Sequence, residues 1–203
     1  MSVCTAAQLK SRLDITVAGA DAALAEVIAG VVADFEAWCR RRLVRPAAAV
    51  TEYWDGGHAD SATIFLNYFP AVVITSVKES LYHGHAAAGV TALTANDDYI
   101  LNDARGRLVR VGAWLSGPDA VQVVYTGGYA AAGVTPLPAG QIAMPDKIIE
   151  AAIRQASFVW QRRKSLGLTS ESMGPASMTA YARDELLPTV RELLAEYRRV
   201  LIG

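Results

Sequence analysis

Few residues in this chain have the types and spacing that catalysis or metal binding needs, and they are scattered. His83 and His85 have the alternate spacing that would turn two imidazoles to one side of a strand. The surrounding sequence does not offer the remaining ligands of a tetrahedral site at a recognisable spacing. Asp97 and Asp98 form an adjacent carboxylate pair at a position typical of turns. Together with His58, these residues are expected to be solvated loop side chains.

The glycine motifs that bind phosphates or expose a nucleophile are absent from the sequence. The patterns G-x-x-x-x-G-K-[ST], G-x-G-x-x-G and G-x-S-x-G do not occur. Gly127 and Gly128 follow an expected strand, but Tyr-Ala-Ala-Ala comes next, without the signals that open a phosphate-binding helix. The sequence therefore predicts a protein without catalytic residues, cofactor or metal.

Three basic clusters are the remaining candidates for binding. They are Arg40-Arg41-Arg42, Arg162-Arg163-Lys164 and Arg198-Arg199. Each lies at or near the expected C-terminus of a helix, where cations offset the negative end of the helix dipole. Two clusters on one face would bind nucleic-acid phosphates with a salt-dependent affinity, and a cluster would also suit carboxylates of a neighbouring subunit. Trp114, in a loop bounded by Gly and Ser, is expected to be exposed at an interface.

The composition indicates an apolar but nearly neutral protein. At 203 residues and 21.6 kDa, the chain is large enough for one well-buried core. Charged residues make up 19%, below the roughly 25% of typical domains. Partner subunits would cover such a surface, and richness in alanine is the alternative explanation. The net charge of −1 provides no basic field that would recruit nucleic acid.

Neither export nor membrane insertion is indicated. The N-terminus lacks a basic segment followed by an apolar run. The most apolar helix expected, residues 22–43, contains Glu26, Asp34 and Glu36, which argues against a membrane span. Cys4 and Cys39 form no disulfide framework and are expected to be free thiols in a reducing cytoplasm.

Apolar residues at three- and four-residue intervals predict four helices. The first covers residues 6–13 behind a Thr5 cap, and the second begins at Asp21. The third follows Pro145 and the last follows Pro188. The expected buried stripes are Leu24, Ile28, Val31, Phe35 and Trp38 in the second helix, Ile149, Ile153, Ala156 and Trp160 in the third, and Val190, Leu194, Tyr197 and Leu201 in the last.

Between residues 50 and 126 the pattern changes to a period of two, which predicts strands. They are expected at residues 51–54, 63–66 and 72–77, in a hairpin that turns at Gly106, and in a strand with Val121, Val123 and Tyr125 on one side. Three other segments are expected to be irregular: a loop at residues 83–95, a Gly/Pro/Ala connector at residues 130–143 and an unpatterned arm at residues 168–182.

These elements predict an α+β protein, in which a bundle of long amphipathic helices carries an inserted antiparallel β block. A C-terminal arm and helix complete the expected fold. The expected domains are a helical connector domain at residues 1–165, with the β insertion at about residues 50–126, and a flexible arm with the C-terminal helix at residues 166–203.

The order of these segments resembles the siphophage-type head-tail connector (adaptor) family of phages and gene transfer agents. ITVAGADAALAEVIAGVVADFEAWCRRRL, EYWDGG and LNYFPAVVITSV resemble the first half of that family. DDYILN, GRLVR, VVYTGGYA and MPDKIIEAAIRQASFVWQRR resemble its second half, and SESMGPASMTAYA resembles its arm. The resemblance covers roughly residues 8–201. The long Ala/Gly loop at residues 83–95 departs from the family pattern.

The resemblance implies a structural subunit at the head-tail interface of a virion or phage-like particle assembled in the bacterial cytoplasm. Family members form a ring below the portal, usually a dodecamer. The ring extends the DNA channel and docks stopper or tail proteins, and DNA passes without sequence-specific contact. No catalytic residue, cofactor or membrane is involved. The residues expected at interfaces are Trp114, Arg40, Arg41, Arg42, Arg162, Arg163 and, in the arm, Met173, Gly174 and Tyr181.

Two other hypotheses stay open at this point. A DNA-packaging accessory protein would bind duplex DNA nonspecifically through the arginine clusters, with an affinity that falls steeply as salt increases. A small hydrolase would depend on His83 or His85, and alanine at both positions would abolish its activity.

Overall fold

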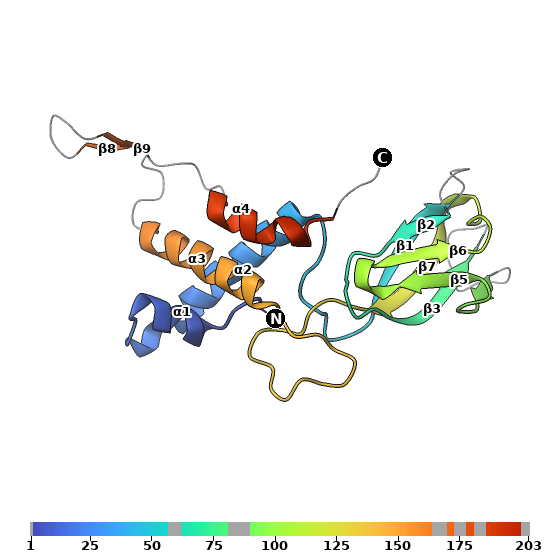
Figure 1. Cartoon of the computed structure of the whole chain (residues 1–203), viewed down its shortest axis with the longest axis horizontal. Coiled ribbons are helices and arrows are strands. Elements are labelled where there is room, and N and C mark those ends of the chain that lie inside the picture. The colour runs from blue at the N-terminus through green and yellow to red at the C-terminus, as the bar shows by residue number, and fades with distance from the viewer. Residues whose placement is uncertain are drawn as a thin grey trace. The chain divides into compact units, whose positions relative to one another are not determined.

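The computed structural model describes residues 2–56, 62–80, 90–163, 170–172, 178–180 and 186–199. The chain divides into two compact units (Figure 1). The β unit is Arg41–Met144, and the helical unit combines Ser2–Arg40 with Pro145–Gly203. The chain therefore enters the β unit once, after the first helical segment, and leaves it once, before the second.

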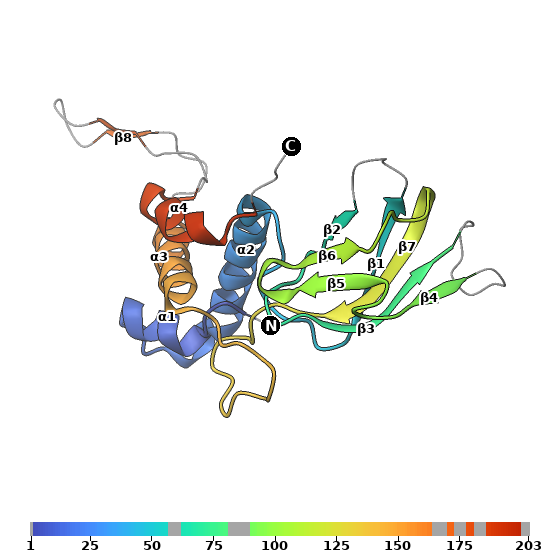
Figure 2. The same ribbon diagram turned by 45° about the vertical axis from the view of Figure 1, so that its right-hand side comes forward.

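The described part of the helical unit contains α1 (Ala6–Leu13), α2 (Asp21–Cys39), α3 (Asp146–Arg162) and α4 (Pro188–Leu194), with 3-10 turns at Ala18–Ala20 and Ala195–Tyr197. Thr5 caps α1 as predicted, because Thr5 Oγ1 accepts a hydrogen bond from Gln8 N and the Gln8 side chain accepts one from Thr5 N. α3 contacts α1, α2 and α4, so it forms the centre of this unit (Figures 1 and 2). None of the helices in the described ranges is both long and apolar enough to cross a bilayer.

The α+β class is confirmed, but the expected bundle of long amphipathic helices is not observed. The helices have 8, 19, 17 and 7 residues. In α2 the predicted stripe is confirmed up to Phe35, and Cys39 is buried at its end in place of the half-buried Trp38. α4 ends at Leu194, well before the predicted end of the last helix. Tyr197 lies in the following 3-10 turn, and Leu201 lies outside the described residues.

The predicted buried stripe of α3 is confirmed only at Ala156. Ile149, Ile153 and Trp160 are half-buried. The other buried residues are Ile148, Ala151, Ala152 and Gln155. This helix packs against three others, and small side chains on its buried face allow their backbones to approach. Gln155 is buried because its Oε1 accepts a hydrogen bond from Leu187 N at 3.1 Å, which fixes the chain just before α4.

The β unit contains two antiparallel sheets around one core (Figure 2). One sheet has the order β1 (Val50–Gly56), β7 (Gly117–Thr126), β3 (Val73–Glu79) and β4 (Thr91–Leu93). The other has the order β2 (Thr63–Phe65), β6 (Arg107–Arg110) and β5 (Tyr99–Asn102). Alternate residues of β7 enter the core, namely Val121, Val123 and Tyr125. The predicted strands and hairpin are confirmed, and they divide into two sheets rather than one block.

Two segments that were predicted to be irregular contain strands. In the segment 83–95, β4 pairs with β3, and Val77 lies opposite Leu93. In the segment 168–182, β8 (Ser170–Ser172) pairs with β9 (Met178–Ala180) as an antiparallel ladder. Each of these strands has three residues, which is too short for alternation to be detected in the sequence.

Three backbone segments of the β unit meet beside the point where the chain enters it: residues 41–45, 67–71 and 125–130. We call this meeting point the junction. Its backbone hydrogen bonds run from Arg42 N to Asn67 O at 2.9 Å, from Arg45 N to Tyr129 O at 2.7 Å, from Tyr129 N to Leu43 O at 2.9 Å and from Gly128 N to Pro70 O at 2.7 Å. Each segment is therefore hydrogen-bonded to at least one of the other two.

Tyr125 anchors the junction from inside the core. Its ring is fully buried, and its hydroxyl oxygen accepts hydrogen bonds from Asn67 N at 2.9 Å and from Tyr68 N at 3.2 Å. Burial raises the pKa of this hydroxyl far above its usual value, so the group stays protonated and neutral. This neutral hydroxyl oxygen therefore provides an acceptor for two backbone N–H groups, one of which, Asn67 N, also approaches Glu52 Oε2 at 3.4 Å.

The two glycines at the end of β7 are required by the close packing of the junction. A Cβ atom on Gly127 would lie 2.2 Å from the Tyr68 carbonyl oxygen. Gly128 has a φ of +97°, a conformation that side chains disfavour. Close packing therefore explains why Gly127 and Gly128 are glycines, and no phosphate-binding loop is needed to account for them.

We predict that Gly127→Ala lowers the free energy of unfolding by about 2–3 kcal/mol, because the added methyl group collides with a backbone carbonyl that cannot move aside. Chemical denaturation monitored by circular dichroism measures this. Gly30→Ala is the matched control: Gly30 lies in α2 with no atom within 4 Å of the added Cβ, and the change should stabilise by about 0.5–1 kcal/mol. Equal effects of the two substitutions would contradict the close packing.

Candidate assembly interface

The residues that sequence inspection considered for metal binding are not assembled into a site in the described part of the chain. His58, His83 and His85 lie outside the described residues. Among the described residues, no group of three His, Cys, Asp or Glu side chains is placed to hold a metal ion. Cys4 and Cys39 are buried and form no disulfide. Burial raises the pKa of the Cys4 thiol to about 11, so this side chain is a protonated, unreactive thiol at neutral pH.

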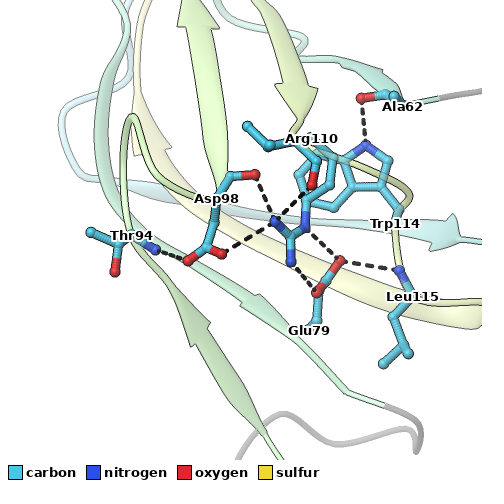
Figure 3. A network of polar contacts seen from close by, with 8 residues as sticks. Ala62, Glu79, Thr94, Asp98, Arg110, Trp114 and Leu115 are labelled. Atoms are coloured by element: carbon cyan, nitrogen blue, oxygen red, sulfur yellow. Dashed lines mark hydrogen bonds and ion pairs between the residues drawn. The ribbon is translucent and has the colours of Figure 1, made fainter.

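A polar network in the described part of the β unit joins its two sheets (Figure 3). Arg110, at the end of β6, approaches Glu79 of β3 through Nε and Nη2, each at 3.4 Å from a carboxylate oxygen. The Nη1 atom of Arg110 donates to the Asp98 carbonyl at 2.7 Å and contacts the Asp98 carboxylate at 3.3 Å. Asp98 in turn accepts from Thr94 N at 2.8 Å. The single guanidinium therefore connects β3 to the segment that leads into β5.

The carboxylate of this network is held by several donors. Glu79 is buried, and its Oε1 also accepts a hydrogen bond from Leu115 N at 3.1 Å. Both of its carboxylate oxygens therefore have donors. The negative charge of Glu79 is balanced by the guanidinium group of Arg110, whose planar shape suits a carboxylate.

The prediction that Trp114 is exposed is wrong. Its side chain is 5% exposed and packs in the core shared by the two sheets. The indole Nε1 donates to the Ala62 carbonyl at 2.9 Å (Figure 3). A tryptophan can be buried in this way when its N–H finds an acceptor. The flanking Gly and Ser residues that suggested exposure lie in the irregular segment between β6 and β7.

The structure divides the first arginine cluster. Arg40 is exposed and ends α2 in a left-handed conformation, with a φ of 54°. Arg41 is buried in the junction, where it donates to the Phe69 carbonyl and its guanidinium lies 3.6 Å from the centre of the Phe69 ring. Arg42 is exposed. These neighbours in sequence therefore have different environments, and Arg41 is a structural residue.

Sequence reasoning missed Arg45, which belongs to no cluster. Its guanidinium donates to the Ala71 carbonyl at 2.8 Å and to Thr126 Oγ1 at 2.6 Å, which connects all three segments of the junction. Burial lowers its pKa from the usual value, as desolvation disfavours a charge. The only signal in the sequence was its position before Pro46, which does not identify its partners.

The two arginines of the second cluster stack on aromatic rings of α3. Arg162 lies 4.9 Å from the centre of the Phe158 ring, and Arg163 lies 3.8 Å from that of Trp160. Arg163 also donates to the Trp160 carbonyl at 2.7 Å. This stacking explains the positions of the two guanidinium groups, and no bound phosphate is needed to explain them. Lys164 and the predicted arm residues Met173, Gly174 and Tyr181 lie outside the described residues, so their role at an interface stays a prediction.

The segment after the junction forms a closed loop at residues 131–141, which we call the Ω loop. Its ends meet because Ala130 N donates to the Ile142 carbonyl at 2.8 Å, next to a bridge between Tyr129 and Ile142. Two further hydrogen bonds shape it, from Val134 N to Ala131 O and from Gln141 N to Pro138 O. Figure 1 shows it as a lobe drawn in yellow-orange just before α3. The predicted connector therefore has a defined conformation.

The Ω loop presents apolar side chains to solvent. Val134, Leu137 and the flanking Ile142 are 43%, 41% and 45% exposed. Residues 120–145 contain no Asp, Glu, Lys or Arg. Exposed apolar residues that are grouped in one uncharged segment make this loop a candidate contact surface.

A second surface lies on the outer side of the β5–β6 hairpin. Here a hollow of about 480 Å³ is lined by Ile100, Leu101, Asn102, Asp103, Arg107 and Val109. Ile100 is 54% exposed, and Leu101 and Val109 are half-buried. Asp103 and Arg107 provide one charge of each sign, so the hollow carries no net charge.

Comparison with known proteins gives a likeness in fold. No protein-family profile and no curated protein match the chain. It is similar to a chain from a structure described as the neck of an empty GTA particle computed with C6 symmetry, with a TM-score of 0.54 and 19% identity. It is also similar to a chain from the virion of a native gene transfer agent (GTA) particle, with a TM-score of 0.54 and 21% identity. In both cases 97% of this chain and 91% of the other are covered.

We predict that the double variant Arg162→Gln, Arg163→Gln changes the affinity for duplex DNA by less than about twofold, because these guanidinium groups are stacked on rings. Mobility-shift titrations at about 50 and 200 mM salt measure this. The same variant should lose about 1 kcal/mol of unfolding free energy from two exposed cation–π contacts.

Lys147→Gln serves as the control for this titration, since it removes an exposed cation whose partner is the Glu196 carboxylate at 2.9 Å. A wild-type affinity that falls steeply with salt, and that the arginine variant alone abolishes, would support a DNA-packaging accessory protein instead.

Proposed function

We propose that this chain is a structural head-tail connector (adaptor) subunit, which forms a ring below the portal of a tailed phage or gene transfer agent. The observation that carries the proposal is the likeness in fold to chains of GTA neck and virion structures over 97% of this chain. Such coverage includes both the helical and the β unit, so the likeness is not confined to a common substructure. The order of sequence motifs described above supports the same family.

The physical character of the surface supports an assembly role. A ring of identical copies needs heterologous contacts, in which one patch meets a different patch on the next copy. The β unit carries an exposed apolar protrusion, the Ω loop, and separately an apolar hollow. An isolated monomer gains nothing from such exposure, whereas an assembled subunit covers it.

A structural role also agrees with the state of the polar groups. The Glu79 carboxylate is occupied by donors, the Tyr125 hydroxyl is held neutral by burial and the Cys4 thiol is protonated. These groups hold the fold together rather than react. We therefore infer a subunit without catalytic function or cofactor, located in the particle at the head-tail interface.

The proposed partners are other copies of this chain, the portal, and stopper or tail proteins. DNA passes through the ring without sequence-specific contact, and a net charge of −1 suits a channel along which DNA moves without being retained. A dodecameric ring is compatible with the C6 symmetry with which the GTA neck structure was computed. The arm that contains β8 and β9 is the proposed contact with the portal, since extended segments cover large surfaces when they become ordered on a partner.

We predict that the purified chain binds the portal protein of its own particle and forms a ring on it, visible by negative-stain electron microscopy. A variant without residues 170–180 should keep the melting temperature of the wild type but fail to attach, because β8 and β9 pair with each other. The control variant Val17→Ser alters an exposed side chain, 68% accessible, and should attach normally. Absence of association with portal, stopper and tail components alike would reject the adaptor function.

A further inference from the structure

The Ω loop is preorganised for binding in the free subunit. Its ends are fixed to the junction by the Ala130–Ile142 hydrogen bond, and Pro136 and Pro138 restrict its backbone. A loop that is already ordered loses little conformational freedom when it binds. The restricted backbone of the loop therefore keeps the apolar side chains of Val134 and Leu137 exposed to solvent.

The hollow on the β5–β6 hairpin matches the Ω loop in polarity, charge and size. Its apolar lining includes Ile100 and Val109, and its two charges, on Asp103 and Arg107, are of opposite sign. An uncharged loop brings no charge that would be left unpaired on burial. A volume of about 480 Å³ is large enough to receive aliphatic side chains such as those of Val134 and Leu137.

We propose that the Ω loop of one copy packs into the β5–β6 hollow of the neighbouring copy, so that this contact, repeated around the axis, closes the ring. The inference rests on the proposed adaptor function and specifies how the subunits meet. The occupant is a second copy because one chain carries both the protrusion and the recess. A contact between unlike patches on identical copies continues from subunit to subunit and closes when the rotation permits.

Two complementary variants test this contact directly. Leu137→Asp places a charge on the loop, and Ile100→Asp places one in the hollow, both at exposed positions that the fold tolerates. Each variant alone should fail to form closed rings on the portal at concentrations where the wild type forms them. An equimolar mixture should form heterodimers, because one intact loop still meets one intact hollow. Mass photometry distinguishes the three states.

Val111→Asp is the matched control, because Val111 is 54% exposed, as Ile100 is, but does not line the hollow. It should form rings as the wild type does. Unchanged melting temperatures for all three variants establish that they fold. Rings from Leu137→Asp or Ile100→Asp alone would overturn the proposed contact while leaving the adaptor function intact.

A cross-linking experiment avoids reliance on disruptive charges. The double variant Leu137→Cys, Ile100→Cys should give a ladder of disulfide-linked oligomers under mild oxidation on the portal, at least tenfold more than either single variant. Dimers from Leu137→Cys alone would show that loops meet loops, and rings on the portal without a ladder would place the loop against a different protein. Either result overturns the inference but not the adaptor function. Absence of both rings and cross-links would reject both proposals.

Discussion

The hydrogen-bonded crossing of three backbone segments at the junction is the constraint on which the β unit depends. Residues 41–45 begin this unit, residues 125–130 contain the end of β7 and the residues after it, and residues 67–71 are hydrogen-bonded to both. Arg45 bridges Ala71 to Thr126, and Tyr125 accepts from two amides of the crossing segment. Because Gly127 and Gly128 carry no side chain, the backbones of the three segments can lie in direct contact.

The junction connects the interior of the protein to the surface that we propose for assembly. The backbone of Tyr129 bonds to Leu43 and Arg45 on one side and bridges to Ile142 on the other, so the base of the Ω loop continues the junction. At the far side of the core, Arg110 and Glu79 hold the two sheets together. The hollow and the Ω loop are thus borne by one folded unit, and a ring contact between them would depend on the integrity of its core.

The sequence predicted the elements whose signals are local. The apolar periodicity of α2, the Thr5 cap of α1 and the alternation along β7 were sufficient to place these elements. Prediction from the sequence failed where contacts between distant residues decide whether a side chain is buried. Trp114 is buried because Ala62, distant in sequence, supplies an acceptor, and α3 buries alanines because three helices approach it. The Ω loop was predicted only as a connector, since hydrogen bonds between its ends have no periodic signature.

Hydrogen–deuterium exchange of the subunit, free and assembled on the portal, tests the whole account most directly. The amides of Arg45, Gly128 and Tyr129 should be strongly protected in both states, because they bond across the junction in the free subunit. The amides of residues 131–141, apart from the hydrogen-bonded Val134 and Gln141, should be weakly protected in the free subunit and become protected only on assembly. Rapid exchange at the junction, or an Ω loop that stays unprotected in the ring, would contradict the account.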